Sequence, residues 1–305
     1  IDRGLVGSEM CIRDSDFTIS NHFEGHDPSS DEGLVRWLNR VAETTAAMIA
    51  HWERVGFVHG VMNTDNMSIH GITIDYGPFG WVEDYDPNWT PNTTDSNTRR
   101  YTFGNQRLVG EWNFARLLEA VSPLFEDPSN LYRSLEHYRT SFKSHTEAMW
   151  VSKLGLRQSA PGDDELVAQL VSLLRVVETD MTIFFRSLGT IDGLNPLDMA
   201  HAYYDEAALP VDELGLWLGK WWSRVDGDPD REAMNNANPK YVLRNWMSQL
   251  AIEAAEADDY SVAIELQDLL RAPYEEQPSS QDRWYKKRPE WARHKVGCSM
   301  LSCSS

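Results

Sequence analysis

The sequence predicts an α+β fold that is predominantly α-helical and contains one short β-hairpin. From Leu108 onward, apolar residues recur at the three- and four-residue intervals of amphipathic helices through most of the chain. Between His59 and Gly80, loops punctuated by glycine flank the alternation Ile72-Thr73-Ile74, which is typical of a hairpin. The 305 residues, 41% of them hydrophobic, suffice for one large domain or two small ones.

The first elements are a leader and a long helix. Residues 1–15 show no clean period and resemble translated adaptor sequence, so we interpret them as a non-native leader; an ordinary N-terminal arm is the alternative. Ser29 and Glu32 have the spacing of a capping box, which predicts the start of a helix. The apolar stripe of this helix is expected to face the core, and it consists of Leu34, Leu38, Val41, Met48, Trp52 and Val55.

The segment from His59 to Gly80 carries the residue types of a metal and nucleotide site. Asp65 and Asn66 lie on its first loop, and Asp75 follows the second predicted strand. An Asn and an Asp brought together by a hairpin supply the hard oxygen ligands that Mg²⁺ combines with phosphate and water oxygens. We therefore expect Asn66 and Asp75 to bind Mg²⁺, with Mn²⁺ as a second candidate.

The spacing within this segment is similar to that of protein kinases, with one departure. His59, Asn66 and Asp75-Tyr76-Gly77 match the His, the Asn and the Asp-Phe-Gly turn of the kinase pattern. The kinase proton acceptor would fall on Val61, five residues before Asn66, and valine accepts no proton. The pattern predicts a nucleotide site that does not work as a kinase.

Five stretches of the chain resemble the selenoprotein O family of protein adenylyltransferases. The resemblance spans roughly residues 16–305 and implies a protein-kinase-like C-lobe that binds ATP in an inverted orientation. It implies transfer of AMP to Ser, Thr or Tyr hydroxyls of proteins, with Asp65 as the catalytic proton acceptor. Asn66 and Asp75 would be the Mg²⁺ ligands, and Asp75 would also contact the nucleotide. The five stretches are His59–Gly80, Trp81–Pro87, Arg100–Gln106, Asn238–Asn245 and Ser302–Ser305.

Two loops follow the candidate site. The first holds the carboxylates Glu83, Asp84 and Asp86 among aromatic residues, and we expect it to be solvated, with contacts to metal or substrate as the alternative. The second, Thr90–Asn97, is rich in Thr, Asn, Pro, Asp and Ser, which predicts an exposed, mobile segment. Its position corresponds to that of a kinase activation segment.

The remainder of the chain is expected to be helical, with a clear linker at Asp226–Asn238 and an extended tail from Pro273. We predict a kinase-like C-lobe with a helical continuation at 16–225, C-terminal helices at 226–272, and the tail at 273–305. In the tail, Cys298 and Cys303 are either redox-active or simply two exposed thiols. The predicted helices are centred on Trp112–Val121, Leu131–Phe142, Gly162–Phe184, Leu214–Trp221, Asn238–Ala254 and Tyr260–Leu270.

The composition limits the partners and the compartment. With 28 Lys and Arg against 47 Asp and Glu, the net charge of −19 argues against nucleic acid and anionic membranes as partners. The sequence contains no apolar run long enough for a membrane span. Three cysteines do not form a disulfide framework, so we expect a reducing compartment, bacterial cytoplasm or, in a eukaryote, mitochondria.

The residues that would hold the triphosphate are not recognisable upstream of His59. A site of this class needs a Gly-rich loop and a Lys held by a Glu. Between Asp16 and Gly56 only Gly25 and Gly33 occur, so we interpret the chain as a C-terminal part without its N-lobe, inactive by itself. The alternatives are ordinary phosphoryl transfer and a non-catalytic, pseudokinase-like nucleotide-binding or helical interaction module.

Overall fold

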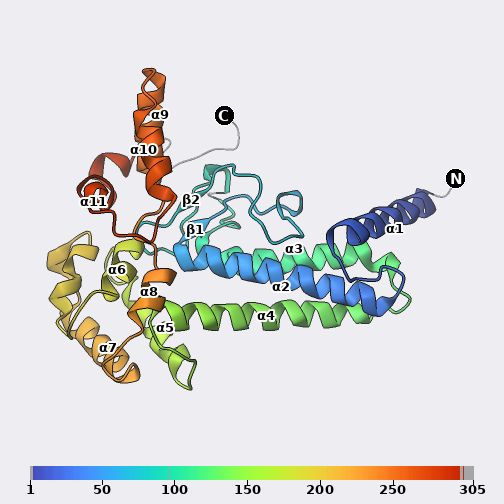
Figure 1. Cartoon of the computed structure of the whole chain (residues 1–305), viewed down its shortest axis with the longest axis horizontal. Coiled ribbons are helices and arrows are strands. Elements are labelled where there is room, and N and C mark those ends of the chain that lie inside the picture. The colour runs from blue at the N-terminus through green and yellow to red at the C-terminus, as the bar shows by residue number, and fades with distance from the viewer. Residues whose placement is uncertain (1–2, 96, 296–297, 299–305) are drawn as a thin grey trace. The chain divides into compact units, whose positions relative to one another are not determined.

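The computed structural model describes residues 3–95, 97–295 and 298, and it is mostly helical with one small antiparallel pair of strands (Figure 1). The chain forms two compact units. Unit 1 consists of residues 1–50, 62–76 and 106–146; unit 2 consists of residues 51–61, 77–105 and 147–305. The domain boundaries expected from the sequence remain a prediction.

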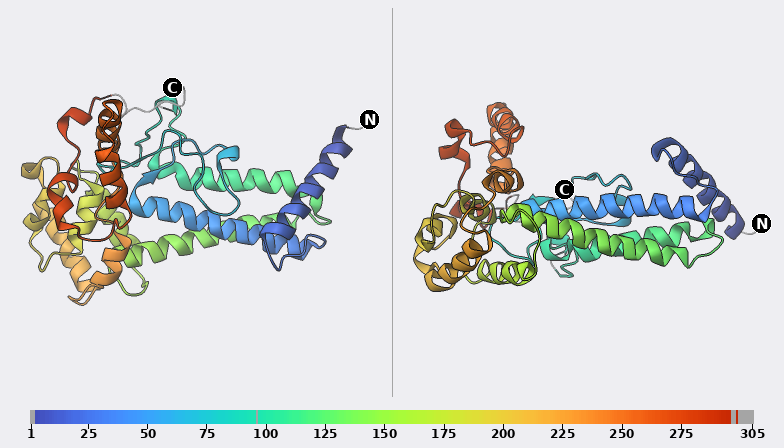
Figure 2. Two further views of the ribbon diagram at one scale, coloured as in Figure 1. Left: turned by 45° about the horizontal axis from the view of Figure 1, so that its top comes forward. Right: turned by 60° about the horizontal axis from the view of Figure 1, so that its bottom comes forward.

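Unit 1 is built on three helices that pack side by side (Figures 1 and 2). They are α2 (Asp31–Val55), α3 (Gln106–Val121) and α4 (Asn130–Lys153), and the ends of α2 and α4 continue into unit 2. Gly110 of α3 fits directly against Ile49 and the Tyr138 hydroxyl, because a Cβ there would lie 2.2 and 2.6 Å from them. Phe114 stacks on Tyr138 at 5.5 Å. Helix α1 (Arg3–His22) contacts α3.

The start of α2 confirms the expected helix but moves its cap by one residue. The Ser30 hydroxyl, not that of Ser29, accepts the hydrogen bond from the Gly33 amide at 3.2 Å. Ser29 instead donates through its amide and its hydroxyl to Asp27 Oδ1, at 2.9 and 2.6 Å. This Asx turn fixes the entry of the chain into the helix.

The strands of unit 2 lie at the two ends of the candidate site segment. Strand β1 (Phe57–Val58) pairs antiparallel with β2 (Gly80–Trp81). The hairpin that we expected at Ile72 and Ile74 is wrong, since the described residues 67–79 form no strand. An alternating pattern forms a strand only when a partner and a buried face are available, and Ile72 is 57% exposed.

In the described part of unit 2, the α-helices α5 to α11 follow, around a core that includes Trp217 and Trp221. The two indoles stack with centroids 6.2 Å apart, and their Nε1 atoms donate to the carbonyls of Leu166 and Leu154 at 2.9 and 2.8 Å. The helices are α5 (Asp163–Leu173), α6 (Met181–Leu188), α7 (Val211–Arg224), α8 (Arg231–Ala237), α9 (Asn245–Glu256), α10 (Ser261–Leu270) and α11 (Pro278–Trp284).

Several of these helices differ from those the sequence predicts. The single helix expected over Gly162–Phe184 is two, α5 and α6, because the Asp180 side chain caps a new helix by accepting from the Ile183 amide at 2.9 Å. The expected linker contains α8, and the helix expected from Asn238 begins at Asn245. The segment after Pro273, expected to be extended, contains α11. Among the described residues, no helix is long and apolar enough to cross a membrane.

Candidate active site

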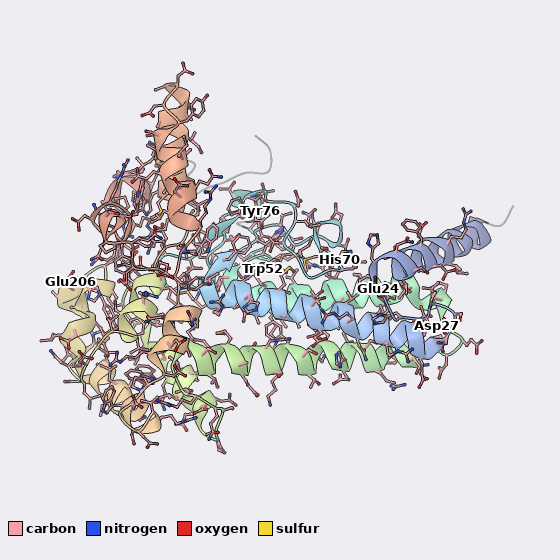
Figure 3. The ribbon with its side chains drawn as sticks, viewed as in Figure 1. Glu24, Asp27, Trp52, His70, Tyr76 and Glu206 are labelled. Carbon is pink, nitrogen blue, oxygen red and sulfur yellow. The ribbon has the colours of Figure 1, made fainter. Side chains whose placement is uncertain are left out.

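The loop from Met62 to Tyr76 belongs to unit 1 and is fastened to α2, to α3 and to Phe23, the residue that follows α1. From α3, Asn113 donates through Nδ2 to the Met62 carbonyl at 2.9 Å. Gly71 is pressed against α2, where a Cβ would lie 2.6 Å from both the Cβ and the carbonyl oxygen of Thr44. The ring of His70, which Figure 3 labels, stacks on that of Phe23, just after α1, with ring centroids 5.2 Å apart. The loop is therefore a defined structure and not a free connection.

Asp65 lies at the centre of a short 3-10 turn, Thr64–Asn66, in this loop. The Asn66 amide donates to the Asn63 carbonyl at 3.0 Å and closes the turn. The Asp65 side chain is exposed and that of Asn66 is half-buried. The carboxylate of Asp65 is therefore accessible to solvent.

Asp75 occupies a backbone conformation that L-residues rarely adopt. Its φ is +55°, in the left-handed region, and its side chain is exposed, as is that of the adjacent Tyr76 (Figure 3). Asp and Asn tolerate this region better than most residues, yet it costs of order 1 kcal/mol relative to glycine, and such strain often marks a functional position. A glycine would adopt this backbone conformation at lower cost, so the presence of an aspartate indicates a role for its side chain.

The side chains of Asn66 and Asp75 are of the types that bind Mg²⁺ at nucleotide sites. Asn66 and Asp75 offer an amide and a carboxylate oxygen on one short loop with solvent access. Among the described residues, no group of three or more His, Cys, Asp or Glu side chains could hold a metal ion. A Mg²⁺ ion held by one or two protein oxygens and completed by phosphates and water matches its usual behaviour at nucleotide sites. The assignment of Asp65, Asn66 and Asp75 stays a prediction.

The ends of the loop are fixed within unit 2. His59 is buried, and its Nδ1 accepts from the Val61 amide at 3.4 Å. Gly60, at φ +80°, lies directly on Pro78, since a Cβ would be 2.4 Å from the Pro78 carbonyl oxygen. The Asn92 Nδ2 donates to the Gly60 carbonyl at 3.0 Å. These contacts hold the chain where it leaves toward Asp65 and where it returns after Asp75.

The segment in the position of a kinase activation loop is more buried than we expected. Pro91, Asn92 and Asp95 are buried, although the prediction placed the stretch in solvent. The Asp95 carboxylate accepts hydrogen bonds from the amides of Arg100 and Tyr101 at 3.0 and 2.7 Å. Its polar side chains bind backbone groups, those of Arg100 and Tyr101 for Asp95 and that of Gly60 for Asn92. Composition alone does not distinguish such residues from solvated ones.

The acidic loop after β2 is less solvated than we expected, since Glu83 is buried while Asp84 and Asp86 are only partly exposed. Glu83 is 7% exposed and lies 3.4 Å from the guanidinium of Arg288, which also binds Asp84 at 2.9 Å. Burial raises the pKa of Glu83 to about 7, against the opposing effect of Arg244 and Arg288. The loop is thus fastened to residues near the C-terminal end, and the contact to metal or substrate that we considered gains no support.

A buried ion pair next to Glu83 went unnoticed in the sequence. Asp180 and Arg244 are 0% and 2% exposed, and they form a two-pronged pair with N–O distances of 2.6 and 2.9 Å. Burial lowers the pKa of Arg244, but the adjacent Asp180 carboxylate outweighs it and raises the pKa overall. Arg244 lies in the stretch Asn238–Asn245 that carried the resemblance, whereas nothing in the sequence singles out Asp180.

Of the two tail cysteines, the structure describes Cys298. Cys298 is 5% exposed, so the interpretation as an exposed thiol is wrong for this residue. It packs with Trp284 and Ala292 in the cluster around α9, α10 and α11, and burial raises the pKa of its thiol. Cys303 lies outside the described residues.

Comparison with known proteins agrees with the resemblance seen in the sequence. The sequence model of the family described as protein adenylyltransferase SelO matches residues 7–271. A protein nucleotidyltransferase YdiU from Flavobacterium johnsoniae is 48% identical over 304 residues, covering 95% of this chain and 58% of that protein. One from Azoarcus sp. (strain BH72) is 46% identical over 307 residues, covering 97% and 59%.

A third relative with the same name, from Xanthomonas axonopodis pv. citri, is 46% identical over 299 residues and is matched over 58% of its length. The chain therefore spans less than two thirds of the curated relatives it matches. Because the family model covers most of the chain and the identity is high over nearly all of it, the chain belongs to the family of protein adenylyltransferase SelO.

Proposed function

We propose that the protein to which this chain belongs transfers AMP from Mg·ATP to Ser, Thr or Tyr hydroxyls of other proteins. The chain would supply the kinase-like C-lobe of that enzyme, with the metal ligands and the proton acceptor. Family membership supports the class of reaction. The observation that carries the residue assignment is the fastened loop, which presents an exposed Asp65 and holds Asp75 in an unfavourable backbone conformation.

In this proposal each polar residue of the loop has a separate task. Asn66 and Asp75 hold Mg²⁺, which when bound offsets the negative charge of the phosphates and of the leaving pyrophosphate. Asp65 accepts the proton of the attacking hydroxyl. Its exposure suits a protein substrate, because a hydroxyl on a folded partner reaches only side chains at the surface.

The experiment that tests these tasks uses a full-length relative with substitutions at the matching positions. Asp65→Asn should leave Mg·ATP affinity near normal and lower turnover by roughly 10²–10⁴-fold, the range for loss of a general base. Joint loss of thermal stability and nucleotide affinity in this variant would show a structural role and contradict the assignment.

Asp75 can be tested in a way that separates metal binding from folding. Asp75→Gly relieves the left-handed backbone and should hold or raise the unfolding temperature, while Mg²⁺-dependent ATP binding is lost in calorimetry. Asp75→Ala should also lose Mg²⁺-dependent ATP binding, but its backbone stays in the strained left-handed region. Unchanged Mg·ATP affinity in both variants would refute Asp75 as a ligand.

The type of transfer is read from the mass added to the modified protein. An added AMP group supports the proposal, and an added phosphate supports ordinary phosphoryl transfer. Nucleotide binding without any adduct supports the pseudokinase-like alternative. For residues 16–305 alone we expect weak Mg·ATP binding and no detectable AMP transfer, because a triphosphate held only at this loop would be screened by water. Self-modification of this segment at the rate of a full-length relative would contradict that expectation.

A further inference from the structure

Unit 2 contains a small cavity with a largely aromatic wall. Its volume is about 160 Å³, below the range of about 300–1,000 Å³ that is typical for drug-sized ligands, so it suits a compact chemical group. Tyr85 and Trp150 are half-buried, which leaves part of each side chain accessible. The aromatic and thioether side chains of the lining are Tyr85, Phe103, Trp150, Met149 and Met181, and all of them belong to unit 2.

The aromatic wall is held in place by hydrogen bonds between separate segments of the chain. The Tyr85 amide donates to the Thr179 carbonyl at 2.9 Å, and the Gly104 amide donates to the Pro87 carbonyl at 2.8 Å. The rings of Tyr85 and Phe103 meet edge to face, with their planes at 86° and their centroids 6.0 Å apart. The two rings therefore form a corner that exists before any occupant arrives.

The cavity lining also contains a carboxylate residue. Glu53 of α2 is half-buried and is part of the wall. Burial raises the pKa of the Tyr85 hydroxyl to about 12, and the negative charge of Glu53 adds to this rise, against the opposing effect of Arg175. The charge of Glu53 thus acts on the aromatic wall from nearby, while Tyr85 stays a neutral phenol at pH 7.

The other charged residue of the lining, Lys153, is bound to partners of its own. Its Nζ donates to the Arg54 carbonyl at 2.9 Å and to Asn238 Oδ1 at 2.8 Å, and it lies 3.7 Å from the centroid of the Phe185 ring. These three residues lie outside the cavity lining. Burial lowers the pKa of the amine well below its usual range, and the charge of Arg54 lowers it further. Lys153 therefore directs its N–H groups to these partners and carries a positive charge less readily than an exposed lysine.

Aromatic rings and a carboxylate together attract a cation with an apolar surface. The faces of aromatic rings carry partial negative charge, and groups of such rings bind quaternary ammonium ions. N-methyl groups also pack well against the thioethers of Met149 and Met181, whereas a primary ammonium brings three N–H donors that need acceptors. We propose that this cavity binds a trimethylammonium head group, which the rings of Tyr85 and Trp150 contact and whose charge Glu53 offsets. The proposal does not depend on AMP transfer, and its test measures binding only.

The charge of the occupant is tested with two probes of nearly equal shape. Choline carries a trimethylammonium group, and 3,3-dimethylbutan-1-ol has the same shape with a carbon atom in place of the charged nitrogen. Titration of the full chain by ligand-detected NMR should show choline binding at least roughly 10-fold more tightly, as expected for a desolvated cation over aromatic rings. Equal affinity of the two probes, or no binding of choline at millimolar concentration, would overturn the proposal.

The location is tested with two pairs of substitutions. Glu53→Gln should weaken choline binding, and Glu43→Gln should not, although it removes an equal charge from the same helix at an exposed position outside the lining. Trp150→Leu should weaken choline binding by roughly 10-fold, and Trp291→Leu, at an indole that is 44% exposed and outside the lining, should leave it unchanged. Glu53→Gln keeps the shape of its side chain, so it tests the site even if Trp150→Leu does not give the circular dichroism spectrum of the parent. Choline binding as strong in the folded Glu53→Gln variant as in the parent would overturn the site.

A free small molecule and a trimethylated lysine side chain of a protein share this head group. The two sources are distinguished by comparing choline with a short peptide that carries trimethyllysine. Tighter binding of the peptide, lost when its lysine is unmodified, supports a protein as the source. Tighter binding of choline supports a small molecule. Equal binding of the modified and the unmodified peptide, together with no preference for choline over its neutral analogue, would contradict recognition of the head group.

Discussion

Replacing Asp180 by Asn should remove a charge from the core while preserving the shape of the side chain. Asp180 has two roles in the structure: it pairs with Arg244 through both carboxylate oxygens, and its Oδ1 caps α6 at the Ile183 amide. An asparagine keeps an oxygen for the cap but leaves the Arg244 guanidinium uncompensated at 2% exposure.

The structure sets the magnitude. Breaking a buried, hydrogen-bonded ion pair by removing one partner costs about 3–5 kcal/mol, because the other charge stays buried. We expect Asp180→Asn near the lower end of that range. Asp180→Ala also removes the helix cap, which is worth about 1 kcal/mol more. Arg244→Met should cost about as much as Asp180→Asn. The double variant that combines Asp180→Asn with Arg244→Met should be more stable, by about 2 kcal/mol, than the sum of the losses of these two single variants predicts. The reason is that neither charge is then buried without its partner.

The assay is urea unfolding at pH 7, followed by circular dichroism, for both single variants and the double variant. The control is Asp228→Asn, which breaks the surface pair between Arg157 and Asp228, where the N–O distance is 2.7 Å and the side chains are 59% and 83% exposed. Its unfolding midpoint should not change measurably. A midpoint for Asp180→Asn as close to the parent as that of the control, or strict additivity in the double variant, would refute the reasoning.

Two further predictions concern Glu83 and Gly71. Since burial raises the pKa of Glu83 from 4.5 to about 7, the folded protein keeps a proton that the unfolded chain releases. The stability from this group is fully present below pH 4.5 and is lost as pH rises through 7, so Glu83→Gln should raise the unfolding temperature at pH 8 but not at pH 5. The control Glu275→Gln, at an exposed residue, should leave the unfolding temperature unchanged at both pH values. A lower unfolding temperature of Glu83→Gln at pH 8 would contradict the raised pKa of Glu83. Gly71→Ala should lower stability by about 1–3 kcal/mol through its clash with Thr44, measured by thermal unfolding. The control is Gly25→Ala, at a glycine that also has a positive φ but has no atom within 4 Å of the added Cβ, and it should lower stability less. Equal losses of stability in the two variants would show that the contact with Thr44 is not the cause.

Much of the helical part of the fold could be predicted from sequence, because its signal is local. The helices α2, α4, α7 and α10 lie close to their predicted positions, since each has an apolar stripe that repeats within its own residues. Helix α3 also lies near its predicted position, but its buried face includes Gln106 and Asn113, while Trp112 of the predicted face is 42% exposed. The break between α5 and α6 was missed although its cap is local, since Asp180 accepts from the Ile183 amide three residues further on. What the sequence does not show is the ion pair that holds Asp180 in the core, because its partner Arg244 is 64 residues further along the chain.

The positions of the two strands also could not be predicted from local sequence. Two strands of two residues each, separated by the whole candidate loop, leave almost no pattern in the sequence. The alternation at Ile72-Thr73-Ile74 looked stronger, but it has no partner strand in the structure. A two-residue period does not make a strand where no partner strand lies beside it.

At the candidate site, the sequence indicated the residue types but not how they are held. Asp65, Asn66 and Asp75 stand out because carboxylate and amide oxygens at this spacing are typical of metal and phosphate chemistry. Their supports, Asn113 on α3 and Thr44 on α2, have no such signature, because an ordinary polar residue on a helix becomes an anchor only through its neighbours in space.

The pairing of β1 with β2 has a consequence for protein engineering and for divergence within the family. Phe57 lies opposite Trp81 and Val58 opposite Gly80, so the chain closes on itself before and after the excursion of about twenty residues between them. Neighbouring strands are about 5 Å apart, which makes the two junctions a fixed pair of attachment points. The excursion can therefore be exchanged between relatives as a cassette, with these four residues as the seams. Such chimeras also have to match the helix positions that fasten the excursion, Thr44 of α2 and Asn113 of α3, to the incoming segment.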